Sequence, residues 1–266
     1  MPCFSKSIHT ETSIANLIKL IQHMKNNALF FLLLLILLPS FAFSIGTYAT
    51  GDQLTVHAAS GLILRETAAP TGTKIMTVEY GSLVTVQAEG LKKTAHSVTV
   101  FPGFTIKGFW VKVKTANGKI GFVFDGYLSK YKTPGSLPNG DDPNADDADA
   151  GTIQERYLQM HSPRKAKVDL PKGETRYDRY KVTYTNGAEV EADMGEGGSS
   201  YTIRFNPGMT IEEAYLIGKA MWMEDEENVK STINKGVITL ESGDEMSAMH
   251  VSIKAGIVTL VMQHAD

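Results

Sequence analysis

The sequence predicts an N-terminal signal peptide, then a small all-β barrel, then an α+β domain with an antiparallel sheet and one main helix. Three observations predict this order. A short apolar run follows a lysine near the start, short alternating strands with glycine-rich turns fill residues 50–131, and a helical pattern appears after residue 210. Alternation with a period of two indicates strands, whereas apolar residues recurring every three to four positions indicate a helix.

Residues 1–44 form the predicted leader. Lys25 precedes an apolar run at 28–38, and small residues follow as far as Ser44. A basic residue, a short apolar run and small residues are typical of a secretory signal peptide, with Met24 as an alternative start. An uncleaved membrane anchor is the competing interpretation, although a spanning helix needs roughly 20 apolar residues. We therefore expect a secreted or periplasmic protein that meets the membrane only through its leader.

The charge of the remaining chain argues against nucleic-acid binding. The leader holds three lysines and one glutamate, so the other 222 residues carry 23 basic and 28 acidic side chains. Nucleic-acid binders usually show a basic footprint. The single cysteine, Cys3, lies in the leader, so the remaining chain has no disulfide and no cysteine nucleophile.

A composition change divides the chain after the leader. Residues 132–151 contain three prolines, three glycines and five aspartates, with almost nothing apolar. Such a segment cannot bury enough apolar surface to offset the entropy of ordering it. The sequence therefore predicts a linker between an all-β piece at 50–131 and an α+β piece at 152–266.

The all-β piece contains several short strand candidates. Residues 54–58 and 62–65 are brief and apolar, and residues 74–88 divide into two strands around Tyr80-Gly81. Residues 109–124 divide into two alternating runs at Asn117-Gly118, a dipeptide favoured in tight hairpins. Many short strands with glycine-rich turns predict a small barrel or sandwich.

The α+β piece begins with strand signals and contains one strong helix signal. A hairpin is expected at 179–193 and another strand at 200–205. Thr210 and Glu213 have the spacing of a capping box, which opens a helix. Residues on one face of this helix are apolar, and strand candidates follow it. The apolar positions are Ile211, Ala214, Tyr215, Gly218, Met221 and Trp222, and the later strands are 236–240, 249–253 and 256–262.

Residues 52–131 resemble the bacterial SH3-like domain, often called SH3b. Four segments carry the resemblance in the family's order: SGLILRETAAP at 60–70, VEYGSLVTV at 78–86, FWVKVK at 109–114 and NGKIGFVFDGYLS at 117–129. The resemblance implies an SH3-like barrel that acts as a targeting or binding module.

The chain departs from that family at several positions. A long insertion occupies residues 89–108, Ile63 replaces the usual asparagine, and Phe122 replaces the usual tryptophan of the last strand. The resemblance extends only to residue 131, and residues 152–266 resemble no family that we recognise.

Aromatic side chains are the candidate ligand-binding residues, because SH3-like folds bind ligands with aromatic rings near the strand ends. The alternative is that these rings only pack in the core and loops. Phe101 and Phe104 of the insertion could form one wall of a groove. The candidates are Tyr80, Phe101, Phe104, Trp110, Phe122, Phe124 and Tyr127.

No pattern in the sequence predicts a metal site, a cofactor or a catalytic nucleophile. The histidines after the leader are widely separated, whereas zinc sites normally show a close pair. An aspartate-rich stretch from Asp142 starts like a calcium loop, but its sixth and twelfth positions are Asp147 and Ile153. Neither a nucleophile elbow nor a phosphate-binding loop is present.

The leading hypothesis is a non-enzymatic bacterial envelope protein whose SH3-like domain binds a cell-wall glycopeptide or an envelope protein. A second hypothesis is a cell-wall hydrolase with catalytic residues in 152–266 and the barrel as its targeting module. A third is a secreted partner or inhibitor protein that docks through the exposed edges of the sheet.

Overall fold

The computed structural model describes residues 48–88, 94–136, 151–222 and 228–265. All of these residues belong to one compact unit. The predicted signal peptide and most of the predicted linker lie outside the described residues, so both stay predictions, as does the division of the chain at 132–151.

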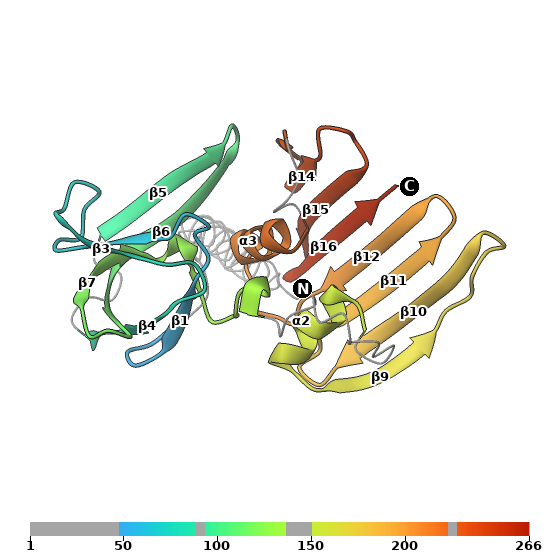
Figure 1. Cartoon of the computed structure of the whole chain (residues 1–266), viewed down its shortest axis with the longest axis horizontal. Coiled ribbons are helices and arrows are strands. Elements are labelled where there is room, and N and C mark those ends of the chain that lie inside the picture. Colours follow the sequence, from blue (N-terminus) through green and yellow to red (C-terminus); the bar gives the residue numbers. More distant parts are fainter. Residues whose placement is uncertain (1–47, 89–93, 137–150, 223–227, 266) are drawn as a thin grey trace, which may run out of the picture. The chain divides into compact units, whose positions relative to one another are not determined.

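The first part of the described chain forms an eight-stranded antiparallel sheet, whose strands curve around a common interior (Figure 1). The strand order is β3-β2-β7-β6-β4-β1-β8, and β5 pairs with β6. The elements are β1 (Gln53–Val56), β2 (Leu62–Arg65), β3 (Lys74–Val78), β4 (Leu83–Val86), β5 (Thr94–Phe101), β6 (Phe104–Thr115), β7 (Ile120–Phe124), the 3-10 turn η2 (Asp125–Tyr127), β8 (Leu128–Ser129) and the 3-10 turn η3 (Pro134–Ser136).

Alternation along these strands divides the side chains between two hydrophobic clusters. Inward-facing residues form a barrel core of small aliphatic side chains, among them Leu54, Val56, Val113 and Val123. Outward-facing Trp110 and Phe124 instead belong to a cluster shared with the C-terminal part of the chain. One face of β6 and β7 therefore closes the barrel, and the other face is covered by a later part of the chain.

The insertion at 89–108 supplies a hairpin. Residues 94–101 form β5, which pairs with the first half of β6 through a turn at Pro102-Gly103. Gly103 has φ of 90°, a left-handed conformation that favours glycine. The predicted strand at 109–124 consequently starts earlier, at Phe104.

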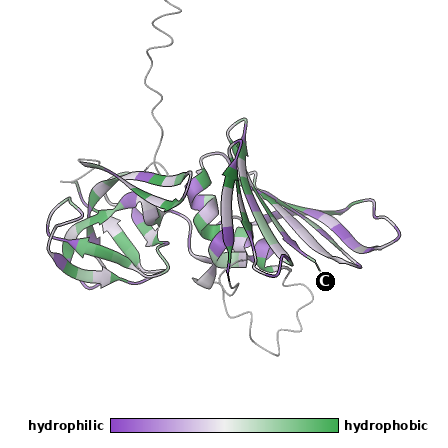
Figure 2. Cartoon of the chain, turned by 90° about the horizontal axis from the view of Figure 1, so that it is seen from above, coloured by the Kyte–Doolittle hydropathy of each residue, from purple (hydrophilic) through white to green (hydrophobic). Residues whose placement is uncertain are grey.

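The C-terminal part forms a second antiparallel sheet of eight strands, in the order β13-β14-β15-β16-β12-β11-β10-β9. Two helices lie on one face of it (Figures 1 and 2). The elements are α2 (Ile153–His161), β9 (Arg164–Asp169), β10 (Arg176–Tyr184), β11 (Glu189–Gly195), β12 (Gly198–Arg204), α3 (Ile211–Trp222), β13 (Lys230–Asn234), β14 (Val237–Glu241), β15 (Ser247–Lys254) and β16 (Ile257–His264).

The expectation of one main helix is wrong, because α2 is a second helix of nine residues. The predicted helix after Thr210 is present as α3, and its capping box is formed. The Glu213 backbone N–H donates to Thr210 Oγ1, and the Thr210 N–H donates to Glu213 Oε2. These bonds satisfy two backbone donors that a helix start leaves unpaired.

The two helices begin with the same short sequence pattern. Thr152 opens TIQERYL at 152–158, and Thr210 opens TIEEAYL at 210–216, 58 positions later. Thr152 Oγ1 also accepts the backbone N–H of Glu155. Each helix is followed by four sequential antiparallel strands. The C-terminal part is therefore an internal repeat of one helix and four strands.

The repeats join through their last strands, β12 and β16, which pair antiparallel at the centre of the sheet. Thr202 pairs with Val261, the residue 59 positions later, so equivalent strands meet nearly at equivalent positions. α2 packs on β10 and β11, and α3 packs on β15 and β16. This arrangement gives the sheet an approximate two-fold symmetry with one helix on each half.

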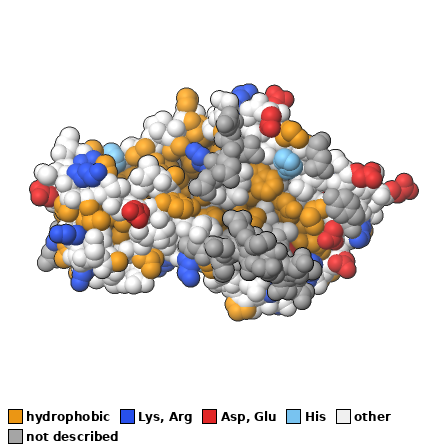
Figure 3. Space-filling view, in the orientation of Figure 1, with side chains coloured by type: hydrophobic (Ala, Val, Ile, Leu, Met, Phe, Trp, Pro, Cys, Tyr) orange, Lys and Arg blue, Asp and Glu red, His pale blue; other side chains and the backbone are white. Residues whose placement is uncertain are grey.

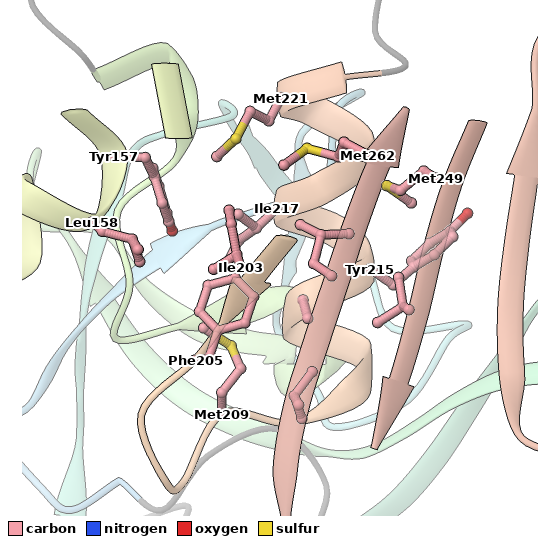
Figure 4. Packing of buried hydrophobic residues seen from close by; sticks show 14 of the residues in the cluster. Tyr157, Leu158, Ile203, Phe205, Met209, Tyr215, Ile217, Met221, Met249 and Met262 are labelled. Atoms are coloured by element: carbon pink, nitrogen blue, oxygen red, sulfur yellow. The ribbon is translucent and has the colours of Figure 1, made fainter. Parts of the chain in front are cut away.

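Close packing holds α3 on its half of the sheet. Ile217 and Met221 of α3 point towards the side chains of Ile203 and Met262 (Figure 4). A Cβ added at Gly218 would lie 2.7 Å from Met249 Sδ, so the helix approaches the sheet as closely as glycine allows. This packing fixes the position of the helix face that points away from the sheet.

That other face of α3 contacts the barrel. The Tyr215 ring lies 4.9 Å from the Phe104 ring and 6.2 Å from the Phe101 ring, between centroids. Ser129 Oγ donates a 2.6 Å hydrogen bond to Glu213 Oε1, and both residues are buried. One apolar contact and one buried polar contact therefore join α3 to the β5–β6 hairpin and to β8 of the barrel.

We predict that Ser129→Ala lowers the free energy of unfolding by about 1.5–3 kcal/mol, the typical value of a hydrogen bond to a charged group. The buried Glu213 carboxylate would lose the donor that the barrel provides. Denaturant unfolding measures the change, with the exposed Ser60→Ala as the matched control. Equal stability of Ser129→Ala and the control would contradict the contact.

The same carboxylate predicts a pH dependence. Burial raises the pKa of Glu213 above its ordinary value of 4.5. The folded state therefore binds a proton more tightly than the unfolded state, and wild-type stability declines as the pH rises from about 4.5 through the raised pKa. We expect Glu213→Gln to lack this decline. The stability of the wild type relative to Glu213→Gln should therefore fall as the pH rises, which denaturant unfolding at several pH values measures.

Candidate ligand-binding pocket

A cavity of about 670 Å³ lies between the barrel and α3. This volume is within the range of pockets that hold small molecules. Four segments line it: the β1–β2 loop, β5, the strands and turn that carry the aromatic rings, and α3. The lining residues are His57, Ala58, Ala59, Ser60, Gly61, Leu62, Ile63, Arg65, Tyr80, His96, Val98, Val100, Trp110, Phe124, Tyr127, Tyr215, Leu216, Lys219 and Ala220.

The structure brings together four of the seven rings that the sequence singled out. Tyr80, Trp110, Phe124 and Tyr127 all line the cavity. Trp110 and Phe124 are each only 4% exposed, whereas Tyr80 and Tyr127 are half-buried.

The other three candidates lie elsewhere. Phe101 and Phe104 pack on Tyr215 and thus hold the barrel to α3 rather than line the cavity. Phe122 is half-buried on β7, opposite Arg65 and Lys112 of the neighbouring strands. Packing is the role that the structure gives to these three rings.

His96 of the insertion adds a ring that the sequence analysis did not select. Its imidazole lies 5.4 Å from the Trp110 ring and 5.0 Å from the Phe124 ring, the latter edge-on. Phe124 in turn meets Tyr127 edge-on at 5.8 Å. Edge-to-face contacts at these distances are favourable, and they hold the rings in fixed positions. The signal in the sequence was the period of two that places His96, Val98 and Val100 on one side of β5.

Two cavity-lining residues each have a buried polar atom with no hydrogen-bond partner among the described residues: Nδ1 of His57 and Nε1 of Trp110. Both side chains are 4% exposed. His57 Nε2 lies 2.9 Å from the carbonyl oxygen of Tyr131. A carbonyl only accepts, so Nε2 carries the proton and Nδ1 presents a lone pair.

Burial lowers the pKa of His57, so the ring is neutral at neutral pH. Neither His57 Nδ1 nor Trp110 Nε1 is itself exposed, so the surface that the cavity offers to a ligand consists mainly of apolar and ring atoms.

The charged side chains at the cavity are basic. Arg65 and Lys219 line it, and no Asp or Glu occurs among its described lining residues. Elsewhere the surface carries both signs, and on the face in Figure 3 basic side chains are scattered among acidic ones. The cavity is thus an aromatic site with a local positive charge on a chain of net charge −3.

Among the described residues, no group of three or more His, Cys, Asp or Glu side chains is placed to hold a metal ion. Within the same residues, no helix has the length and apolar character needed to cross a membrane.

Comparison with known proteins supports the resemblance of the barrel. Residues 60–129 match the model of the bacterial SH3 domain, which confirms the sequence-based recognition of this segment. The match covers about a quarter of the chain. No curated protein and no solved structure matches the chain. A bacterial SH3 domain suggests a binding module, and four of the cavity-lining rings lie in the matched segment.

We predict that the His57 imidazole titrates below 6.5, because burial penalises its charged form. His57 then contributes stability that is present above pH 6.5 and is lost as the pH falls through its lowered pKa. An NMR titration of the ring protons measures the midpoint, and His57→Gln identifies the signal. A midpoint at or above 6.5 would show that the ring is not buried as described.

Proposed function

We propose that the protein is a non-enzymatic secreted or periplasmic binding protein of the bacterial envelope. Its SH3-like barrel holds a cell-wall glycopeptide or an envelope protein segment in the aromatic cavity. The observation that carries the proposal is the meeting of four aromatic rings and two basic side chains at one cavity. The bacterial SH3 match and the leader pattern favour the envelope as the place of action.

A glycopeptide has the groups that this cavity can contact. The flat faces of its amides and sugars pack on aromatic rings. The local positive charge suits the free carboxylates of a peptide stem. These features support a peptide-containing ligand over a purely apolar one.

The hydrolase alternative receives less support from the described residues. Glycosidase chemistry needs two facing carboxylates, and the cavity has none among its described lining. The buried carboxylates of the C-terminal part have structural partners. Glu155 accepts hydrogen bonds from Tyr180 and Arg164, and Glu213 accepts one from Ser129. We therefore propose binding without turnover.

The third alternative, docking through a sheet edge, has one observation in its favour. All six residues of β9 are exposed, and Val168 on this edge strand is 57% exposed. Lysines on an edge strand discourage pairing with another chain, and β9 carries Lys165 and Lys167. We rank this alternative below the cavity.

Sedimentation with purified peptidoglycan tests the proposed function. We expect the wild-type protein without its leader to pellet with the wall material. Ser60→Tyr, which places a ring at the exposed rim of the cavity, should weaken binding by on the order of tenfold, or about 1.4 kcal/mol. Trp110→Phe should act in the same direction, because it removes part of the aromatic surface that lines the cavity.

The matched control is Trp222→Phe, because Trp222 does not line the cavity. Protein that stays in the supernatant would remove the wall-binding function. Binding that is equal in wild type, Ser60→Tyr and Trp110→Phe would place the wall contact outside the cavity.

A further inference from the structure

The cavity extends beyond the segment that matches the bacterial SH3 domain. Tyr215, Leu216, Lys219 and Ala220 of α3 line it, and they lie more than 80 positions after the end of the match at residue 129. Residues four positions apart on a helix lie on the same face, so Tyr215 and Lys219 form one row of the wall, and Leu216 and Ala220 form the row beside it. The barrel supplies one wall of the cavity, and the C-terminal repeat supplies another.

The α3 wall is held in a fixed position from two sides. Gly218 presses the helix against Met249 and Leu260 of the sheet, and Tyr215 packs on Phe104 of the barrel. The Ser129–Glu213 hydrogen bond fixes the first turn. A wall held in this way keeps its side chains oriented before a ligand arrives, which reduces the entropy cost of binding.

Comparison of α3 with the equivalent helix α2 separates the residues that both helices use for packing from those that differ. Glu213 and Tyr215 have the same residue types at the equivalent positions of α2, Glu155 and Tyr157, and all four are buried. The position equivalent to Lys219 is His161, whose ring packs on Tyr157. Lys219 is exposed, so packing of the helix does not explain why a lysine stands at this position.

The charge of the cavity gives such a reason. Arg65 Nη1 donates to the carbonyl oxygen of Gly72 at 2.6 Å, so part of this guanidinium is already engaged. Lys219 contributes an exposed ammonium group to the same cavity, which has no carboxylate among its described lining.

We propose that α3 forms a ligand-binding wall of the cavity, and that Lys219 makes the cavity select ligands that carry a carboxylate. The apolar and amide parts of the ligand pack in the aromatic cavity, and the carboxylate lies near the exposed Lys219. This inference rests on the proposed function for the use of the cavity, but it assigns a specificity role to the C-terminal repeat.

The test follows the indole N–H signal of Trp110 by NMR in the protein without its leader. Trp222→Phe assigns the signal, since the chain has only two tryptophans. The two probes are N-acetylphenylalanine, which carries an amide and a carboxylate, and its carboxamide, N-acetylphenylalaninamide. We expect the first probe to shift the Trp110 signal at a concentration about two- to fivefold lower than the second, the range of an exposed ion pair.

Lys219→Met should remove this difference by weakening the carboxylate probe by the same factor, and Lys219→Glu should weaken it further. Lys254→Met is the control, because Lys254 is exposed and does not line the cavity. Both substituted lysines are exposed, so the variants should keep the wild-type spectrum elsewhere. Three results would overturn the inference: equal half-saturation concentrations for the two probes, the same preference for the carboxylate probe in Lys219→Met as in the wild type, or no shift with either probe.

These outcomes are independent of the peptidoglycan experiment. If Lys219→Met binds the wall as the wild type does, and both probes bind equally well, then Lys219 has no role in selection, but the proposed function still stands. If probe binding depends on Lys219 but the protein does not bind the wall, then the role of Lys219 stands and the proposed function is contradicted.

Discussion

The contact of Tyr215 with Phe101 and Phe104 carries the functional arrangement of this chain. It joins the tip of the β5–β6 hairpin to the outer face of α3, and the buried Ser129–Glu213 hydrogen bond adds a second attachment. An exposed hairpin of this length would leave Phe101, Phe104 and Ile106 in water, so covering them with α3 is favourable by the hydrophobic effect. The cavity lies beside this contact, and its shape depends on it.

The two halves of the C-terminal repeat are similar in sequence, but only α3 of the second half makes this contact with the barrel. Both helices start with a threonine cap and a buried glutamate, and both place a tyrosine two positions later. In α2 the glutamate accepts from Tyr180 and Arg164 of its own sheet, whereas in α3 it accepts from Ser129 of the barrel. Equivalent residues therefore stabilise one repeat internally and attach the other to the SH3-like domain.

Strong local patterns allowed most of the fold to be predicted, and their absence explains the rest. β2, the Asn117-Gly118 hairpin and the capping box of α3 all have residue-level signals, and all are present. α2 was missed because the buried positions of QERYLQMH include Gln154 and Glu155, which hide the apolar period. β9 was missed because RKAKVD is a charged edge strand.

The aromatic candidates were selected by type, but only contacts with α3, about a hundred positions later, separate the cavity rings from the packing rings. His57 gave no such signal, since its state depends on which of its ring atoms the fold leaves without a partner.

The central claim is that α3 covers the aromatic face of the barrel and leaves a cavity beside Trp110. Nuclear Overhauser contacts between ring protons of Phe104 and Tyr215 test it most directly. Their ring centroids lie 4.9 Å apart, so cross-peaks between the two rings should be strong in the protein without its leader. A spectrum of the folded protein in which both rings are assigned and share no cross-peak would contradict the account.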